Sequence, residues 1–194
     1  MLVFVSNRSG GHGVLDLYVS RREDDEDDSE WGPSENLGSD VNTDANELSP
    51  HFQNKGEAGK STLYFARAAD IFWAPMSKDG TLLGQATALA EINSTSPDFG
   101  PTVSKDGLEL MIQSGRPGGL GGTDIWVSTR ASVEVSWSTP LNLGTPVNTA
   151  AGDFAPAISF DGHILLFAGD AARGGQGGQE IWISTRTPIS GGGD

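Results

Sequence analysis

The chain has 194 residues, a formal net charge of −14 and no cysteine, so it has neither disulfide bridges nor thiolate metal ligands. A surface this acidic repels phosphate groups, which disfavours nucleic-acid binding and attraction to anionic membranes, and no apolar stretch is long enough to cross a bilayer. Hydrophobic residues make up only 36% and glycine occurs 27 times, a composition typical of short strands joined by tight turns.

An acidic–aliphatic–aromatic triplet recurs along the chain with nearly constant spacing. It appears as Asp16-Leu17-Tyr18, Asp70-Ile71-Phe72, Asp124-Ile125-Trp126 and Glu180-Ile181-Trp182, with first residues 54, 54 and 56 positions apart. Three further markers keep a similar period: Pro50, Pro101 and Pro156; Leu37, Leu89 and Leu143; Asn42, Asn93 and Asn148. Four independent markers with one period indicate an internal structural repeat.

The predicted elements follow one template in chain order. The first unit begins with its second strand, over 2–6, and the second unit lacks a glycine-rich loop because Phe65 lies only five residues before Asp70. The third unit is the most complete. It predicts a first strand (Pro101–Ser104), a hairpin turn (Asp106-Gly107) and a second strand (Leu108–Ser114). A glycine-rich loop (Gly118–Gly122), a third strand (Asp124–Thr129) and a fourth strand (Leu141–Leu143) follow in that order. The fourth unit ends with a third strand over 180–185.

These patterns predict an all-β protein, a β-propeller of about four blade repeats of roughly 54 residues with four antiparallel strands per blade. The expected single domain spans 1–194, with units at 1–48, 49–99, 100–154 and 155–187 and a flexible tail at 188–194. The outer two blades are incomplete, since the first lacks its inner strand and the last its outer strand. Open strand edges favour association, so we expect either a larger ring or a homo-oligomer formed through the open blade edges.

The first and third units resemble the TolB-type WD-like β-propeller repeat. The residues that carry the resemblance are Ser6-Asn7-Arg8, Gly10-Gly11, Trp31, Pro33, Asn36-Leu37-Gly38 and Val41-Asn42-Thr43, and then Gly115-Arg116, Gly118-Gly119, Trp137, Pro140, Asn142-Leu143-Gly144 and Val147-Asn148-Thr149. The resemblance implies a periplasmic or secreted protein of the bacterial cell envelope that recognises protein or glycan partners, although the chain shows no export signal. A fold by itself does not establish a function.

Charged residues that occur in every unit favour a structural role over a catalytic one. An arginine (Arg8, Arg67, Arg116, Arg173) precedes each triplet acid (Asp16, Asp70, Asp124, Glu180), and we expect these arginine–acid pairs to anchor the loops through charge-assisted hydrogen bonds. The glycine-rich loops lack the strand-to-helix setting of a phosphate-binding loop and are interpreted as turns.

Three carboxylates are the candidate functional residues. Glu47, Asp98 and Asp153 each lie three residues before a repeated proline, at the predicted approach to an inner strand. Carboxylates converging on a channel would recruit a cation, with calcium as the candidate, or bind a cationic ligand. Alternatively, each carboxylate accepts backbone hydrogen bonds and caps its own turn.

The predicted function is a non-catalytic binding scaffold for a protein, peptide or glycan, without membrane insertion and with a cation at the channel mouth as an option. No catalytic residue is assigned under this interpretation, and calcium is the only cofactor considered. The alternative is a glycoside hydrolase-like propeller that uses Glu47, Asp98 and Asp153 as its catalytic carboxylates.

Overall fold

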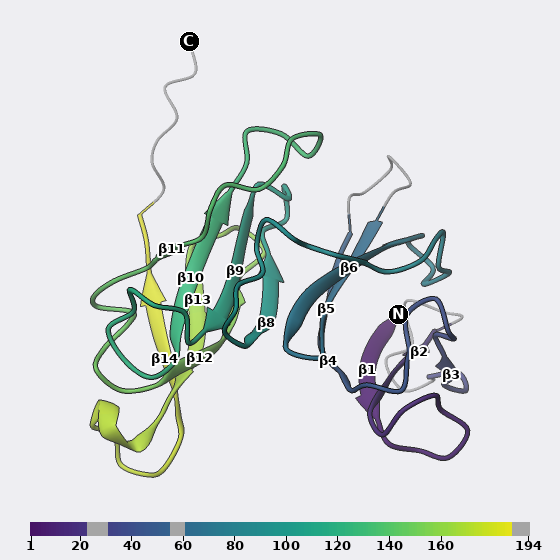
Figure 1. Cartoon of the computed structure of the whole chain (residues 1–194), viewed down its shortest axis with the longest axis horizontal. Helices are drawn as coiled ribbons and strands as arrows, with labels where there is room; N and C mark the ends of the chain where they lie inside the picture. Colours follow the sequence, from purple (N-terminus) through teal and green to yellow (C-terminus); the bar gives the residue numbers. More distant parts are fainter. Residues whose placement is uncertain (23–30, 55–60, 188–194) are drawn as a thin grey trace.

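The computed structural model describes residues 1–22, 31–54 and 61–187 and consists of four antiparallel sheets (Figure 1). Sheet 1 contains β1 (Leu2–Ser6), β2 (Asp16–Ser20) and β3 (Glu35–Asn36). Sheet 2 contains β4 (Glu47–Gln53), β5 (Ser61–Arg67), β6 (Asp70–Met76) and β7 (Thr87–Ala88). Sheet 3 contains β8 (Asp98–Val103), β9 (Glu109–Ser114), β10 (Asp124–Thr129) and β11 (Leu141–Asn142). Sheet 4 contains β12 (Asp153–Ile158), β13 (Ile164–Gly169) and β14 (Glu180–Thr185).

The strand content agrees with the prediction of four blade-like units with incomplete outer members. Sheets 2 and 3 have four strands each, whereas sheets 1 and 4 have three. A single turn of 3-10 helix, η2 (Ala171–Arg173), is the helical element of the described residues, and none of their helices could span a membrane. The predicted tail at 188–194 lies outside the described residues.

The sheets follow one another across the molecule in chain order, from sheet 1 at one end to sheet 4 at the other (Figure 1). An apolar cluster fills each junction: Leu17, Val19 and Phe65 belong to the one between sheets 1 and 2. Ile71, Ile112 and Trp126 contribute to the second junction, and Met111, Ile125 and Phe167 to the third. Because side chains alternate between the two faces of a strand, each inner sheet packs against both neighbours.

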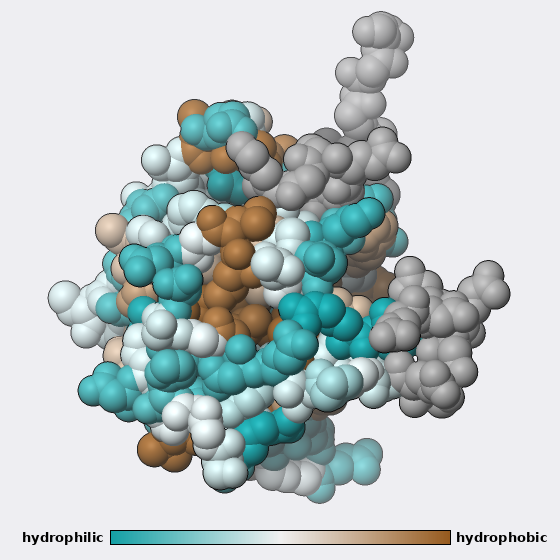
Figure 2. Space-filling view, turned by 90° about the vertical axis from the view of Figure 1, so that its right-hand side faces the viewer, coloured by the Kyte–Doolittle hydropathy of each residue, from teal (hydrophilic) through white to brown (hydrophobic). Residues whose placement is uncertain are grey.

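Hydrophobic surface remains visible at the sheet 1 end of the molecule. Figure 2 shows a band of apolar surface on this side, bordered by hydrophilic side chains. Leu2 of β1 is exposed, as are Val14 and Trp31 in the segments that flank β2. Apolar surface of this kind is expected where a sheet has a neighbour on one side only.

The inner strands begin earlier than the sequence indicated. The repeated prolines were expected to open the first strands, but β4, β8 and β12 begin three residues before them, at the carboxylates. Each strand then has a register shift at the residue before the proline, and these residues (Ser49, Gly100, Ala155) have φ of 51°, 59° and 50°. A bulge accommodates proline within a strand because the ladder is already interrupted there.

The shortened loop of the second unit is a two-residue hairpin. Arg67 pairs with Asp70, and the two residues between them, Ala68 and Ala69, have φ of 50° and 72°. Two successive positive φ values are typical of the type I′ turn, which favours Asn or Gly because alanine is strained in this region.

Replacing Ala69 with glycine should therefore stabilise the protein. We expect Ala69→Gly to raise the free energy of unfolding by about 1 kcal/mol, because glycine adopts positive φ without strain. Urea denaturation followed by circular dichroism measures the change. Ala131→Gly is the control, since Ala131 has no positive φ, and that substitution should leave stability unchanged or lower it. An equal gain in both variants would contradict the explanation.

Candidate functional site

The three predicted site carboxylates occupy the same position in three sheets. Glu47, Asp98 and Asp153 are the first residues of β4, β8 and β12, and all three are 0% exposed. Each forms an ion pair with an arginine at or just after the end of the neighbouring second strand: Arg67 ends β5, whereas Arg116 and Arg173 follow β9 and β13 by two and four residues. Arg67 Nε lies 3.0 Å from Glu47 Oε1, Arg116 Nη2 lies 2.6 Å from Asp98 Oδ1, and Arg173 pairs with Asp153.

Each of these arginines also binds the segment that connects its sheet to the preceding one. Arg116 donates to the Ile92 carbonyl at 2.8 Å and Arg173 to the Val147 carbonyl at 2.6 Å, and Arg67 donates to the Val41 carbonyl. Their guanidinium groups lie over aromatic rings, as Arg116 does over Trp126. The arginine thus joins a carboxylate, a backbone carbonyl and a ring, which fixes the spacing of adjacent sheets.

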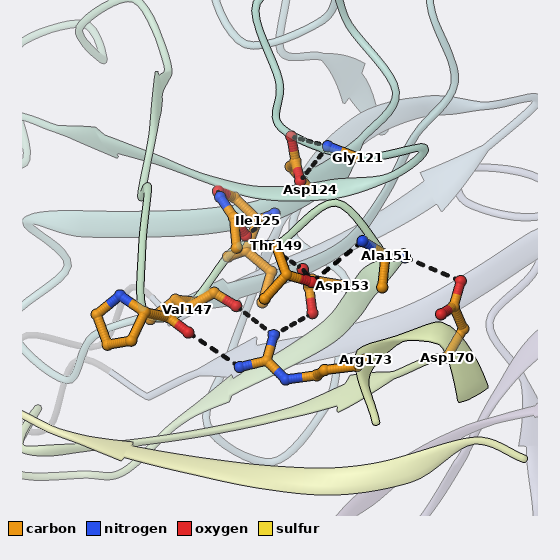
Figure 3. Close-up of polar contacts among 12 residues, drawn as sticks. Gly121, Asp124, Ile125, Val147, Thr149, Ala151, Asp153, Asp170 and Arg173 are labelled. Atoms are coloured by element: carbon orange, nitrogen blue, oxygen red, sulfur yellow. Dashed lines mark hydrogen bonds and ion pairs between the residues drawn. The ribbon is translucent and has the colours of Figure 1, made fainter. Parts of the chain in front are cut away.

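The carboxylates also accept hydrogen bonds from the turn that precedes each inner strand. Thr149 donates its backbone N–H at 2.6 Å and its hydroxyl at 3.1 Å to Asp153 (Figure 3). Ser94 makes the same two contacts with Asp98, and the Thr43 hydroxyl donates to Glu47. These contacts are those expected of a turn cap.

Among residues 1–22, 31–54 and 61–187, no group of three or more His, Asp or Glu side chains is placed to hold a metal ion.

Three of the four triplet acids, Asp16, Asp124 and Glu180, cap the glycine-rich loops. The predicted pairing of the repeated arginines with the triplet acids is wrong, because the arginines of the last three units pair with the inner-strand carboxylates. Asp16 accepts from the N–H groups of His12 and Gly13, and Asp124 accepts in the same way from Leu120 and Gly121 (Figure 3). A Cβ on Gly119 would lie 2.1 Å from Asp124 Oδ2, so a side chain there would collide with the cap. The glycine-rich loops are thus closed around a carboxylate. The periodic sequence revealed both charged residues but not which carboxylate each arginine would contact.

The repeated asparagines have a role that their spacing did not reveal. The side chain of Asn42 accepts from the N–H of Leu17 at 2.8 Å and donates to its C=O at 2.9 Å. Asn93 makes the same pair of bonds with Ile71, and Asn148 with Ile125. Each asparagine therefore replaces a strand partner for one residue on the outer edge of a third strand. We call this arrangement the asparagine clamp.

The inner strands of adjacent sheets are joined by side chains. His51 Nε2 of β4 lies 3.2 Å from the N–H and 3.1 Å from the C=O of Val103 in β8. The Thr102 hydroxyl of β8 accepts from the Ile158 N–H of β12 at 3.4 Å. Both side chains satisfy backbone groups on the open edge of the next inner strand.

A groove of about 620 Å³ lies between sheets 2 and 3. Trp73 is the half-buried aromatic residue of its lining, whereas Tyr64 and Trp137 border it as buried core residues. The exposed carboxylates of Glu91 and Glu134 also line the groove. Burial raises the pKa of the Tyr64 phenol, and the positive charge of Arg130, which lowers this pKa, is the smaller effect. The phenol therefore stays a neutral hydrogen-bonding group. Concave surfaces of this size, with aromatic walls and a few polar groups, are typical ligand sites.

Two smaller cavities lie at the hairpin end of sheets 2, 3 and 4. One of about 430 Å³ is bordered by Lys105, Arg130 and Arg186, and one of about 260 Å³ by the ends of the inner strands near His51 and Phe160. The arginines at the first cavity are held in place by hydrogen bonds to the turn carbonyls of Gly107 and Gly162. The groove between sheets 2 and 3 is therefore the larger and more aromatic candidate.

No protein-family model and no curated protein sequence matches the chain. Solved structures show the fold. An endo-arabinase from Bacteroides thetaiotaomicron matches with a TM-score of 0.58 and 19% identity, over 97% of this chain and 71% of that protein. A xylan β-1,4-xylosidase from Bacillus halodurans matches with a TM-score of 0.59 and 16% identity, over 94% and 38%. TolB from Acinetobacter baumannii matches with a TM-score of 0.56 and 13% identity, over 98% and 39%.

These likenesses confirm the predicted all-β propeller class and its four-blade pattern. The chain spans about two fifths of the length of TolB and of the xylosidase. At such low identities the similarity shows the fold alone. Because the matched proteins include both TolB and glycosidases, the fold is shared across different functions.

The buried ion pairs lead to a stability prediction. Arg116→Ala would leave Asp98 buried without its counter-charge, and we expect a loss of about 3–5 kcal/mol in the free energy of unfolding. Arg8→Ala is the matched control, because Arg8 donates to the hydroxyls of Ser6 and Ser34 and has no buried carboxylate partner among the described residues. Denaturant unfolding compares the two, and equal losses would contradict a structural role for the pair.

His51 leads to a pH prediction. Burial lowers the pKa of His51 below its ordinary value of 6.5, and the hydrogen bond with Val103 opposes this only in part. The unfolded chain therefore takes up the proton first, so the stability that His51 contributes is present above pH 6.5 and is lost as the pH falls below it.

The pH dependence should be lost in His51→Gln. Below pH 6.5, the free energy of unfolding should fall with decreasing pH more steeply in the wild type than in the variant. The difference between the two slopes should be at most about 1.4 kcal/mol per pH unit, the limit for one titrating group. Urea titrations at a series of pH values between about 5 and 7.5 measure both slopes. Parallel slopes would show that His51 is not the titrating group.

Proposed function

We propose that the protein is a binding module that holds an extended, positively charged segment of a partner protein in the groove between sheets 2 and 3. The observation that carries the proposal is the partly exposed ring of Trp73 in a groove that also carries the exposed carboxylates Glu91 and Glu134. Aromatic faces attract lysine and arginine side chains, and carboxylates pair with them at the rim. Polar and aromatic groups together give both affinity and orientation.

The charge of the whole molecule supports a cationic partner. A net charge of −14 attracts basic segments over a distance of several ångströms and raises their rate of encounter. The groove itself contributes one positive group, Arg130, whose guanidinium lies 4.0 Å from the ring centre of Trp137 and donates to the carbonyls of Gly107 and Val133. The exposed carboxylates are thus the rim groups open to a ligand.

A glycan ligand is the second candidate, and the fold likeness to an endo-arabinase and a xylosidase favours it. The ring of Trp73 could stack on a sugar ring. Hydrolysis by Glu47, Asp98 and Asp153 has less support, because a general acid must reach the glycosidic oxygen and all three carboxylates are buried against arginines. A calcium ion bound by these residues would likewise have to displace the arginines.

Calorimetric titration with a ten-residue oligolysine peptide tests the proposal. We expect saturable binding that weakens with added salt. Binding should weaken about 5- to 30-fold in Trp73→Ala, since loss of a cation–π contact of this kind is worth on the order of 1–2 kcal/mol. Phe160→Ala is the matched control, because Phe160 is an exposed aromatic residue outside the groove.

The same titration with arabinan and xylan oligosaccharides separates the two candidates. Saturable heat from an oligosaccharide that disappears in Trp73→Ala, without binding of oligolysine, would make the glycan the ligand and the basic-segment proposal wrong. Equal binding of oligolysine to the wild type, Trp73→Ala and Phe160→Ala would show attraction to the acidic surface as a whole and would also overturn it.

A further inference from the structure

Four of the five tryptophans have an arginine guanidinium group over the indole ring. The guanidinium carbon lies 4.8 Å from the ring centre of Trp31, 5.4 Å from that of Trp126, 4.0 Å from that of Trp137 and 4.7 Å from that of Trp182. Within the described residues, no cation lies over the ring of the fifth tryptophan, Trp73. Trp73 is thus the tryptophan whose ring faces no arginine of the described chain occupies.

At the sheet junctions, the guanidinium that covers a ring also pairs with a carboxylate. Arg116 lies over Trp126 and forms an ion pair of 2.6 Å with Asp98. Arg67 and Arg173 repeat this arrangement at the other two junctions. Ring, guanidinium and carboxylate therefore form one recurring unit, in which the flat cation is attracted by both the aromatic face and the negative charge.

The groove between sheets 2 and 3 contains the ring and the carboxylates of such a unit. Trp73 belongs to β6, Glu91 to the connection after β7, and Glu134 to the loop after β10. Both carboxylates are exposed and form no ion pair within the described part of the chain. The basic residue of the lining, Arg130, lies over the ring of Trp137. A cation that enters from another molecule would therefore meet a free aromatic face and an unpaired negative charge.

These groups discriminate between the two basic side chains. A guanidinium is flat and weakly hydrated, so it stacks on an indole ring and donates two parallel hydrogen bonds to a carboxylate. A lysine ammonium is a compact and strongly hydrated charge, and it cannot stack in this way. The exposed side chains of Leu83 and Val135 also line the groove, where they offer apolar surface to the aliphatic stem of an arginine.

We propose that the groove selects arginine over lysine. One arginine side chain of the bound segment stacks its guanidinium on Trp73 and pairs with the carboxylates of Glu91 and Glu134. It thereby completes, from a second molecule, the unit that the protein builds within itself at each junction. This inference rests on the proposed function and adds to it the side chain that is recognised. A segment with lysine in the same place is held by charge alone and binds more weakly.

A blocked five-residue peptide with one central arginine, acetyl-ALRLA-amide, is the probe, because the guanidinium is its single charge. The matched peptides carry lysine or citrulline, the neutral isostere, in place of arginine. We expect the indole N–H signal of Trp73 in a ¹H–¹⁵N spectrum of the intact chain to shift saturably with the arginine peptide. The affinity for this peptide should be at least about five-fold higher than for the lysine peptide and still higher than for the citrulline peptide.

Two variants locate the contact. Glu134→Gln keeps the shape of the side chain and removes its charge, so it should weaken binding of the arginine peptide at least about three-fold. Asp44→Asn is the matched control, because Asp44 is an exposed carboxylate outside the groove, and its affinity should equal that of the wild type. Trp73→Ala should abolish the preference for arginine. If Trp73→Ala does not fold, since Trp73 also packs against the core, Glu134→Gln and the three peptides still decide the question.

Three outcomes would overturn the arginine preference. The first is equal or higher affinity for the lysine or the citrulline peptide. The second is binding of the arginine peptide that is equal in Glu134→Gln and Asp44→Asn. The third is the lack of saturation by the arginine peptide up to about 10 mM. Failure of the proposed function is seen separately, as oligolysine binding that does not depend on Trp73. Oligolysine binding that is lost in Trp73→Ala, with equal affinity for the arginine and lysine peptides, would leave that function standing and make the arginine preference wrong.

Discussion

A buried ion pair between a carboxylate and an arginine holds each sheet junction together. Glu47, Asp98 and Asp153 are removed from water at the start of the inner strands, and such charges are tolerated only when they are paired and hydrogen-bonded. The arginine that provides the counter-charge also binds the carbonyl of the connecting segment. At each junction, one guanidinium group therefore holds the inner strand, the connecting segment and the adjacent sheet in their relative positions.

Much of the fold could be predicted from the sequence because the repeat is visible in residue types. The triplet, the proline, the leucine and the asparagine each recur with one period, and alternating apolar residues mark the strands. The incomplete outer units were also foreseeable from the positions of Leu2 and Glu180. The sequence could not show the bulges before the prolines, since a register shift depends on the partner strand as well as on the residue itself.

The candidate site was less predictable than the fold for a physical reason. Repetition shows that a carboxylate and an arginine occur in every unit, but pairing depends on the direction of each side chain across the sheet. Asp124 accepts hydrogen bonds from its own glycine-rich loop, and Arg116 forms its ion pair with Asp98 instead. The groove between sheets 2 and 3 could not be found from the repeat, because the residues that distinguish it, Trp73 and Glu134, come from different units and converge only in space.

The ion pairs and the asparagine clamps join residues that are close in the sequence. Arg116 and Asp98 are 18 positions apart, and Asn148 and Ile125 are 23 apart. Contacts of such short range close small loops and therefore favour early formation during folding. Each unit can consequently acquire its polar framework while the next is still being synthesised, and the molecule should assemble progressively from its N-terminal end, with cooperativity passed from neighbour to neighbour as in a linear array.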